Sequence, residues 1–264
     1  MQENKKDWVF ILGGSTGFGL ATAHYMAAKG YSVFIVHRDR RGNIPNFMAE
    51  VEKMRSSGVR VCTVNVNALT LEGQEVIIDA LKKEIKNEKI VTFLHSFADG
   101  NLKSILPDIN SKGTLGQDDF LHTINAMGIS FVTWSQILFQ HNFFTEHSRI
   151  IGITSEGSSR VMLNYAAVGA AKSALEAFSR YMANEFAKHK ITVNLLSPGV
   201  SVTPALRAFP NKEQLIHTAT QKNPSGRMTL PEDVAKAVFL LSQAESSWIT
   251  GNIIKVDGGE QLLS

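Results

Sequence analysis

The sequence of 264 residues contains a single cysteine, Cys62. One thiol excludes a disulfide framework, a cysteine-rich zinc site and an iron–sulfur cluster, so we expect no metal site. Scarce cysteine is typical of the reducing cytoplasm, where we expect the protein to act. Strong charge is also lacking, because 27 Lys and Arg oppose 24 Asp and Glu and no basic run exceeds Arg40-Arg41. Without a clustered basic surface, no nucleic-acid partner is expected.

Long apolar runs are scarce as well. Residues 1–7 are polar and charged and lead directly into an apolar strand, so no signal peptide is expected. The stretch from Phe120 to Thr145 contains no Asp, Glu, Lys or Arg, as a membrane span would. Polar side chains interrupt it at nearly every turn, and each is costly in lipid. We therefore expect a helix packed between protein surfaces and no membrane insertion. The interrupting side chains are His122, Asn125, Ser130, Ser135, Gln136 and Gln140.

Strand-like and helix-like segments alternate along the whole chain. Strands are expected at 8–12, 31–36, 60–66, 90–94, 149–154, 191–196 and 252–256, and helices at 20–29, 47–57, 71–86, 118–143, 165–188 and 231–243. This alternation predicts an α/β fold, a doubly wound parallel sheet of about seven strands with helices on both faces. No linker interrupts it, so 1–264 is expected to form a single domain. Ligands of such sheets bind at the carboxyl ends of the strands.

The turn after the first strand is rich in glycine and reads Gly13-Gly14-Ser15-Thr16-Gly17-Phe18-Gly19. Between a strand and a helix, such glycines let the backbone approach a pyrophosphate, which the N–H groups of the helix then bind. A tight turn without a ligand is the alternative, but the setting favours a Rossmann-type dinucleotide site. The glycine spacing resembles that of the short-chain dehydrogenase/reductase family. This resemblance implies cofactor contacts from Gly13, Ser15, Thr16, Gly17, Phe18 and Gly19.

The end of the second strand reads His37-Arg38-Asp39-Arg40-Arg41. An acidic residue at this place binds the ribose 2′-hydroxyl of NADH, whereas an arginine accommodates the 2′-phosphate of NADPH. We predict NADPH in preference to NADH, with Arg38 as the principal phosphate ligand and His37, Arg40 or Arg41 as helpers. Asp39 favours the opposite preference, and a solvated charge run is the alternative interpretation of Arg41.

Further motifs resemble the same family in order along the chain. Asn65-Val66 is similar to the family's adenine-contacting pair, and Asn125 to its helix asparagine, whose carbonyl holds a proton-relay water. Ser155 lies where the family has its active-site serine, 17 residues before Lys172. Helix capping or packing explains any one of these residues alone, but not the ordered set.

The segment from Ser197 to Thr203 resembles the one that packs on the nicotinamide in this family. The resemblance implies that Pro198 and Gly199 contact the cofactor, that the Val200 backbone holds the carboxamide and that Thr203 lies on the phosphate side.

Two departures from the usual family pattern are informative. The usual Tyr-x-x-x-Lys motif would place tyrosine at position 168, where this chain has Val168. Instead Tyr165 precedes Lys172 by seven positions, nearly two helical turns, so both side chains share a helix face. In addition, His95-Ser96-Phe97-Ala98 replaces Asn-Asn-Ala-Gly. Both departures resemble the enoyl-acyl carrier protein reductases, especially their NADPH-dependent branch. The second implies cofactor contacts from Ser96, Phe97 and Ala98.

This resemblance implies reduction of the trans-2 double bond of an enoyl thioester in fatty-acid or related acyl-chain synthesis. Negative charge then develops on the thioester oxygen as an enolate, which Tyr165 is expected to stabilise by a hydrogen bond. Lys172 is expected to bind the ribose hydroxyls and to favour the tyrosinate form of Tyr165. Ser155 would assist at the oxygen, and Asn125 would support the proton supply.

Residues 204–228 are expected to cover the substrate. Leu206 and Phe209 offer apolar surface for an acyl chain, and Phe97 and Val161 are expected to shape the same pocket. The basic residues of the segment fit an acidic acyl carrier protein, and a solvated face is their alternative interpretation. These residues are Arg207, Lys212 and Lys222.

Two helices bear on assembly. The helix at 118–143 is nearly uncharged, and the next one has a surface of small residues: Ala166, Ala167, Ala170, Ala171, Ala174 and Ala177. In the family that the sequence resembles, these two helices form a dimer interface, and residues such as Gln261-Leu262-Leu263 complete a tetramer. A homotetramer is therefore expected.

Two other functions compete with enoyl reduction. One is a carbonyl reductase or alcohol dehydrogenase of the same fold acting on a ketoacyl, steroid or sugar substrate, because fold does not fix function. The spacing of Tyr165 and Lys172 argues against it. The other is a catalytically silent, cofactor-binding protein. The presence of Asn125, Ser155, Tyr165 and Lys172 argues against this second alternative.

Overall fold

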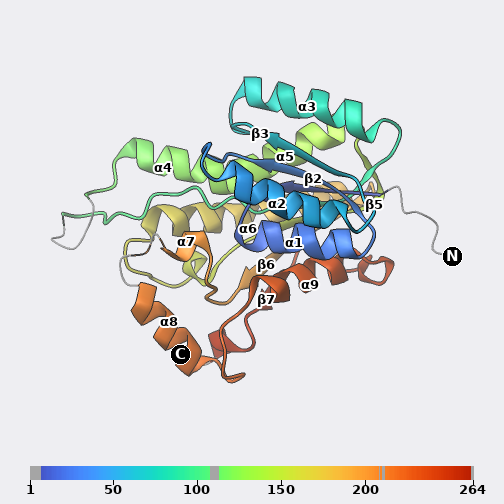
Figure 1. Ribbon diagram of the computed structural model, residues 1–264. Helices are drawn as coiled ribbons and strands as arrows, with labels where there is room; N and C mark the ends of the chain where they lie inside the picture. Colours follow the sequence, from blue (N-terminus) through green and yellow to red (C-terminus); the bar gives the residue numbers. More distant parts are fainter. Residues whose placement is uncertain (1–6, 108–112, 208, 210–211, 263–264) are drawn as a thin grey trace.

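The computed structural model describes residues 7–107, 113–207, 209 and 212–262 (Figure 1). In this part of the chain, seven parallel strands form one sheet in the order β3-β2-β1-β4-β5-β6-β7. The strands are β1 (Trp8–Leu12), β2 (Ser32–His37), β3 (Val61–Asn65), β4 (Ile90–His95), β5 (Phe144–Ile153), β6 (Thr192–Pro198) and β7 (Ile253–Val256). The predicted parallel sheet of about seven strands is confirmed.

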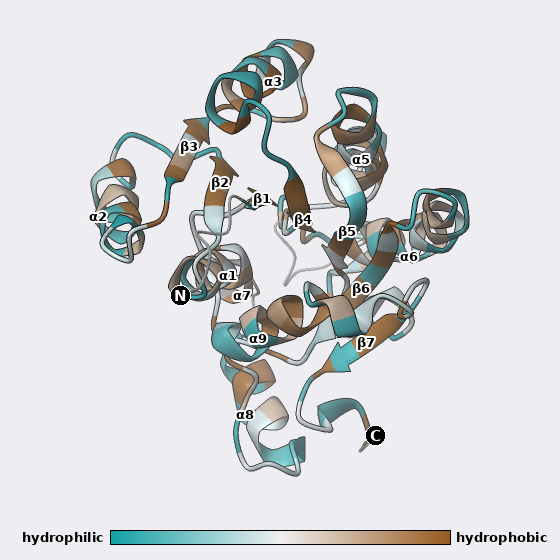
Figure 2. Cartoon of the chain, turned by 90° about the vertical axis from the view of Figure 1, so that its right-hand side faces the viewer, coloured by the Kyte–Doolittle hydropathy of each residue, from teal (hydrophilic) through white to brown (hydrophobic). Residues whose placement is uncertain are grey.

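Helices cover both faces of the sheet, as the alternating sequence predicts (Figure 2). Helices α1, α2 and α9 lie on one face and α3, α5 and α6 on the other. The helices are α1 (Gly17–Ala28), α2 (Ile44–Arg55), α3 (Leu71–Ile85), α4 (Gln117–Ile124), α5 (Ser130–Gln140), α6 (Ala166–Ala187), α7 (Pro204–Arg207), α8 (Lys212–Lys222) and α9 (Pro231–Leu241). Shorter turns are η1 (Asn125–Ile129), η2 (Glu156–Ser158), η3 (Ala244–Ser246) and η4 (Glu260–Leu262).

Strand β1 divides the hydrophobic core into two layers because its side chains alternate between the two faces of the sheet. Phe10 packs toward α3, α5 and α6, and its ring centroid lies 5.7 Å from that of Trp134 on α5. Val9 and Ile11 pack on the opposite face against α1, α2 and α9. All five residues of β1 are buried, so the strand is apolar without a polar alternation, as is typical of a sheet covered on both sides.

The expected helix at 118–143 is interrupted by a π-helical turn. Helix α4 passes into η1 at Asn125, and α5 continues from Ser130. Here the Ser130 hydroxyl donates to the Ala126 carbonyl at 2.7 Å. A side chain at Gly128 would lie 3.1 Å from the Ala171 carbonyl, so the absence of one lets this helix approach α6 closely. Part of the alanine surface of α6 is therefore buried within the chain itself.

The order of the strands positions the functional edge. The chain builds β1, β2 and β3 outward to one side and then returns to add β4 on the other side of β1. At such a reversal the loops after the two central strands diverge and leave a crevice at their carboxyl ends. Within the described residues, no helix combines the length and the apolar character that crossing a bilayer requires.

Candidate active site

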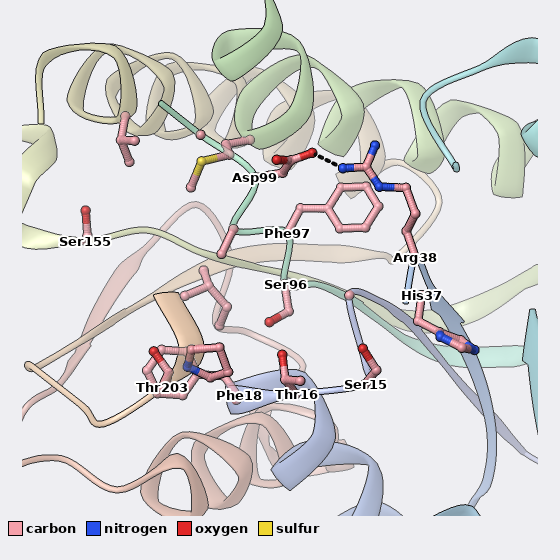
Figure 3. A pocket seen from close by; sticks show the side chains of 18 of the residues that line it. Ser15, Thr16, Phe18, His37, Arg38, Ser96, Phe97, Asp99, Ser155 and Thr203 are labelled. Atoms are coloured by element: carbon pink, nitrogen blue, oxygen red, sulfur yellow. Dashed lines mark hydrogen bonds and ion pairs between the residues drawn. The ribbon is translucent and has the colours of Figure 1, made fainter. Parts of the chain in front are cut away.

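A cavity of about 500 Å³ lies at the carboxyl-terminal edge of the sheet. The segments that follow β1, β2, β3, β4, β5 and β6 form its wall, and Figure 3 shows Arg38 toward one end and Ser155 toward the other. The predicted site residues that line it are Gly13, Ser15, Thr16, Gly17, Phe18, His37, Arg38, Val66, Ser96, Phe97, Ala98, Ser155, Tyr165, Lys172, Thr203 and Phe209. The topology thus brings residues from six strand ends into one space.

Close backbone contacts explain the glycines of the first loop. Gly13 has a φ of +82°, and a side chain there would lie 2.7 Å from the Ser96 carbonyl oxygen. Gly19 does not line the cavity, but a side chain on it would lie 2.1 Å from the Gly13 carbonyl oxygen. Glycine at these positions therefore lets α1 and the loop after β4 approach the turn. A Cβ placed on Gly17 would lie 3.4 Å from the Thr203 side chain, so the segment after β6 packs against the same turn.

The start of α1 is suited to an anion. Thr16 precedes the helix, its first turn contains no acidic residue, and within the described chain no side-chain hydrogen bond from Thr16 caps it. The first N–H groups of a helix have no partner inside the helix and carry a partial positive charge. Because Ser15, Thr16 and Gly17 line the cavity, these groups are available to a phosphate that enters it.

At the end of β2, Arg38 lines the cavity and Asp39 does not. Asp39 Oδ2 lies 2.8 Å from His37 Nδ1, so its carboxylate is committed to a neighbour. Burial lowers the pKa of His37, although Asp39 opposes the shift, and a neutral imidazole supplies no charge for a phosphate. The Asn65 side-chain amide joins the end of β3 to the segment after β2. It accepts a hydrogen bond from Asp39 N at 2.9 Å and donates one to Asp39 O at 3.1 Å.

Tyr165 and Ser155 form the polar end of the cavity. Their hydroxyl oxygens lie 3.0 Å apart, and the tyrosine ring stacks on Phe209 with centroids 5.6 Å apart. Burial raises the pKa of Tyr165, and the hydrogen bond from Ser155 only partly offsets it. The phenol therefore stays protonated at neutral pH and can donate a hydrogen bond. The effect of Lys172 on the tyrosinate form of Tyr165 stays a prediction.

Lys172 and Glu176 fasten α6 to the end of β5. Lys172 is buried and its Nζ donates to the Ile153 carbonyl at 2.7 Å. One turn later, the Glu176 carboxylate accepts from the Thr154 hydroxyl at 2.6 Å. Burial lowers the pKa of Lys172 to about 8, and the charge of Glu176 acts in the opposite direction. Glu176 was not among the predicted residues, although its position four residues after Lys172, on the same helix face, is a usable signal.

Val168 occupies the place where the usual family tyrosine would stand. It is buried and lines the cavity, and a Cβ built on Gly100 would lie 2.8 Å from it and from the Met127 sulfur. A tyrosine at position 168 would meet this packed neighbourhood. Tyr165 is the phenol that the fold places beside Ser155.

His95 joins the end of β4 to the start of α5. Its Nε2 lies 2.7 Å from the Ser130 hydroxyl, and the imidazole is fully buried among Phe93, Phe97 and Phe131. Burial first, and the charge of Lys172 second, lower the pKa of His95 to about 3. His95 is therefore neutral at pH 7 and holds the strand end rather than exchanging protons.

Some predicted residues do not reach the cavity. Asn125 is exposed at the start of the π-helical turn, and Met127 is the residue of this helix that lines the cavity. Val161 is fully exposed because its loop turns outward, and Leu206 is buried beside the wall. The Val200 N–H donates to the Glu260 carboxylate at 3.1 Å, so this N–H is already bonded within the chain. Pro198 and Gly199 also lie outside the lining.

Several lining residues were not predicted. They are Asn67, Ala68, Leu69, Asp99, Gly100, Leu102, Met127, Ile153, Thr154, Val168 and Pro204. Asn67, Ala68 and Leu69 follow directly on a predicted strand, and Asp99, Gly100 and Leu102 continue the predicted segment that ends at Ala98. In the covering segment, the Arg207 side chain and residues 208, 210 and 211 lie outside the described part of the chain, as does Leu263 at the C-terminus.

Known proteins resemble this chain over almost its whole length. The family described as "Enoyl-(Acyl carrier protein) reductase" matches residues 13–261. A 3-oxoacyl-[acyl-carrier-protein] reductase of Bos taurus is 33% identical, covering 96% of this chain and 97% of that protein.

Solved structures share the fold at lower identity. A single-residue variant of actinorhodin polyketide ketoreductase with NADPH superposes with a TM-score of 0.83 at 20% identity and covers 98% of this chain and 99% of its own. An enoyl-(acyl-carrier-protein) reductase of Anaplasma phagocytophilum in complex with NAD gives a TM-score of 0.80 at 21% identity and covers 98% and 93%. By the matched family and the cattle relative, the chain belongs to the short-chain dehydrogenase/reductase family.

Proposed function

We propose that the protein reduces the trans-2 double bond of an enoyl thioester with NADPH, in fatty-acid or related acyl-chain synthesis. The observation that carries the proposal is the position of the phenol. Tyr165 faces Ser155 at the cavity wall, and Val168 fills the place of the usual family tyrosine. The family match described by the name of an enoyl reductase supports the same reaction.

The displaced phenol suits the geometry of enoyl reduction. In a ketone, the oxygen that gains charge is bonded to the carbon that receives the hydride. In an enoyl thioester, this oxygen lies two bonds farther from the carbon that receives it. Tyr165 lies three positions before Val168, which corresponds to about 4.5 Å along a helix at 1.5 Å per residue. A donor moved by this amount suits the more distant oxygen.

The cavity fits a nicotinamide dinucleotide. The glycines at 13 and 19 leave no room for side chains, the α1 N-terminus is open to a phosphate, and Arg38 and Lys172 supply positive charge at separate places. When bound, the reduced nicotinamide supplies the hydride that reaches the β-carbon of the substrate. Arg38 would hold the 2′-phosphate, and Lys172 the ribose hydroxyls.

The chain's own residues then stabilise the charge that develops. The protonated Tyr165 donates a hydrogen bond to the thioester oxygen as it becomes an enolate oxygen, and Ser155 orients this phenol from 3.0 Å. Preorganised donors of this kind cost no rearrangement during the reaction. A proton from the solvent, delivered to the α-carbon, completes the reduction, and the ring of Phe209 stacks on Tyr165.

A second candidate is reduction of a 3-oxoacyl thioester, which the 33% identity to the cattle reductase favours. Oxidation of NADPH at 340 nm with a crotonyl thioester and with an acetoacetyl thioester separates the two. Turnover of crotonyl thioester alone supports the proposal, and turnover of acetoacetyl thioester alone replaces it with the second candidate. Oxidation with neither substrate would indicate a catalytically silent, cofactor-binding protein.

Arg38→Ala is expected to raise the Michaelis constant for NADPH at least about tenfold and to leave that for NADH nearly unchanged. A hydrogen bond to a charged phosphate typically contributes about 1.5–3 kcal/mol. Steady-state kinetics with both cofactors measure the effect, and Arg41→Ala, which removes an exposed neighbour outside the cavity lining, is the matched control. An unchanged constant for NADPH in Arg38→Ala would overturn the assignment.

The pH profile is expected to report the charge of Lys172. With its pKa at about 8, Lys172 carries a proton below this pH and loses it as the pH rises, so kcat/KM is expected to fall above about pH 8. Glu176→Gln removes the charge that raises this pKa, and the alkaline limb is expected to move to lower pH. Thr154→Val breaks the hydrogen bond to Glu176 but keeps the charge, so its limb should stay in place. Identical limbs in Glu176→Gln and wild type would contradict this role.

Three expectations stay predictions: that an acyl carrier protein carries the substrate, that the protein forms a homotetramer, and that it acts in the cytoplasm. The exposed apolar side chains of the described residues include Ile129 and Phe139 on the helix that was expected at an interface.

A further inference from the structure

We propose that Asp99 moderates the preference of this site for NADPH by competing with the 2′-phosphate for Arg38. This inference rests on the proposed NADPH-dependent function and names a further residue that controls it. Its basis is an ion pair across the cavity, in which Arg38 Nη2 lies 2.8 Å from Asp99 Oδ2.

The pair spans the cavity from two different strands. Arg38 follows β2 and Asp99 follows β4, and β1 with its glycine turn lies between these strands in the sheet. Both side chains line the cavity, and Figure 3 shows their contact above the ring of Phe97, with Ser15 and Thr16 on the other side of that ring. The ion pair thus lies at the end of the cavity where Arg38 is proposed to bind the 2′-phosphate.

The acidic residue that competes for Arg38 is therefore Asp99 and not Asp39, its neighbour in sequence. The Asp39 carboxylate is engaged by His37 at 2.8 Å and lies outside the cavity lining. Asp99 lines the cavity and already holds Arg38. Its Oδ2 also lies 3.4 Å from His122 Nε2, so the carboxylate has a second neighbour from α4.

Competition follows from the chemistry of the two anions. A guanidinium binds a carboxylate or a phosphate through the same N–H groups, so Arg38 must leave Asp99, at least in part, to bind the 2′-phosphate. NADH carries only a 2′-hydroxyl at this position and leaves the pair intact. Asp99 thus weakens NADPH binding without the same effect on NADH, and it moderates a preference that Arg38 alone would make stronger.

The expected effect is moderate because the pair is half exposed. The side chains of Arg38 and Asp99 are 56% and 43% accessible, and exposed ion pairs are weak. Asp99→Asn is expected to tighten NADPH binding about three- to fivefold and to change NADH binding by less than about twofold. Fluorescence titration with each reduced cofactor measures both constants, and displacement by 2′,5′-ADP against 5′-ADP isolates the contribution of the phosphate.

Control variants sharpen the test. Asp118→Asn removes an exposed carboxylate at the start of α4 that does not line the cavity, and it should leave the ratio of the two constants unchanged. In an Arg38→Gln background, Asp99→Asn should no longer tighten NADPH binding, because no guanidinium remains to compete for. A gain that persists without Arg38 would overturn competition and assign direct repulsion to Asp99.

Further binding results would contradict either this inference or the proposed cofactor. Equal gains for NADPH and NADH, or no gain for NADPH, overturn the inference. A wild-type protein that binds NADH but not NADPH contradicts the proposed cofactor separately. In that case, NADPH binding that appears in Asp99→Asn still supports the competition, and its continued absence refutes it. None of these binding measurements depends on the enoyl substrate, so they are independent of the substrate assignment.

Discussion

Tyr165→Phe is expected to lower kcat for enoyl thioester reduction about 10²- to 10³-fold with little change in the binding of NADPH. The substitution removes one preorganised donor to the developing enolate, and loss of one such donor typically costs this factor. The ring remains, so the stack on Phe209 and the packing of the helix start are kept. Steady-state kinetics at saturating cofactor measure the loss, and circular dichroism confirms the fold.

Tyr181→Phe is the matched control for this variant. Tyr181 lies on the same helix, α6, but its side chain is 72% exposed and does not line the cavity. The same chemical change there should leave kcat within about twofold, as is usual for surface substitutions. Full turnover in a well-folded Tyr165→Phe protein would remove the tyrosine from the mechanism and, with it, the main argument for enoyl reduction.

Gly19→Ala is expected to weaken NADPH binding on the order of a hundredfold and to destabilise the fold by about 1–3 kcal/mol. The added methyl group would lie 2.1 Å from the Gly13 carbonyl oxygen, and its nearest neighbours are all backbone atoms of Gly13 and Gly14, so no flexible group can move aside. The turn must therefore shift away from α1, and its N–H groups no longer point toward the phosphates. Each such bond to a charged group contributes about 1.5–3 kcal/mol. Cofactor titration and thermal unfolding measure the two effects.

Gly42→Ala provides the comparison. This glycine follows Arg41 on the surface, and a methyl group on it would meet nothing within 4 Å. Neither cofactor binding nor the midpoint of unfolding should change measurably. If Gly19→Ala bound NADPH as tightly as Gly42→Ala does, the close approach of α1 to the first turn would not be what shapes the phosphate site.

The sheet was predictable because its signals are local. Each strand is a short apolar run. Helices α1 and α2 begin three residues before their expected starts, but the expected ranges agree with the observed ones to within one or two residues for most strands. Strand β5 is an exception, since it begins at Phe144 rather than at 149. Polar and charged residues at 145–148 hid this start, which depends on pairing with Ile90 of the neighbouring strand.

The helix at 118–143 shows the opposite case. Its uncharged sequence predicts one continuous helix, yet a π-helical turn from Asn125 to Ile129 interrupts it. That turn depends on Ser130, which lies against His95 on a distant strand, and on the close packing of Gly128 against α6. Because the turn changes which side chains face inward, Met127 lines the cavity and Asn125 does not.

The single cysteine and the small net charge indicated few kinds of partner, and the sequence by itself determined the order of elements, the glycine turn, the likeness to one family and the seven-residue spacing of Tyr165 and Lys172. These depend on residue type and spacing along one element. Only the tertiary structure decided that Asp99 pairs with Arg38, that Glu176 accepts a hydrogen bond from Thr154 beside Lys172, and that Val161 faces solvent. Each of these depends on the direction of a side chain relative to another segment, and that direction is fixed only when the loops at the sheet edge pack together.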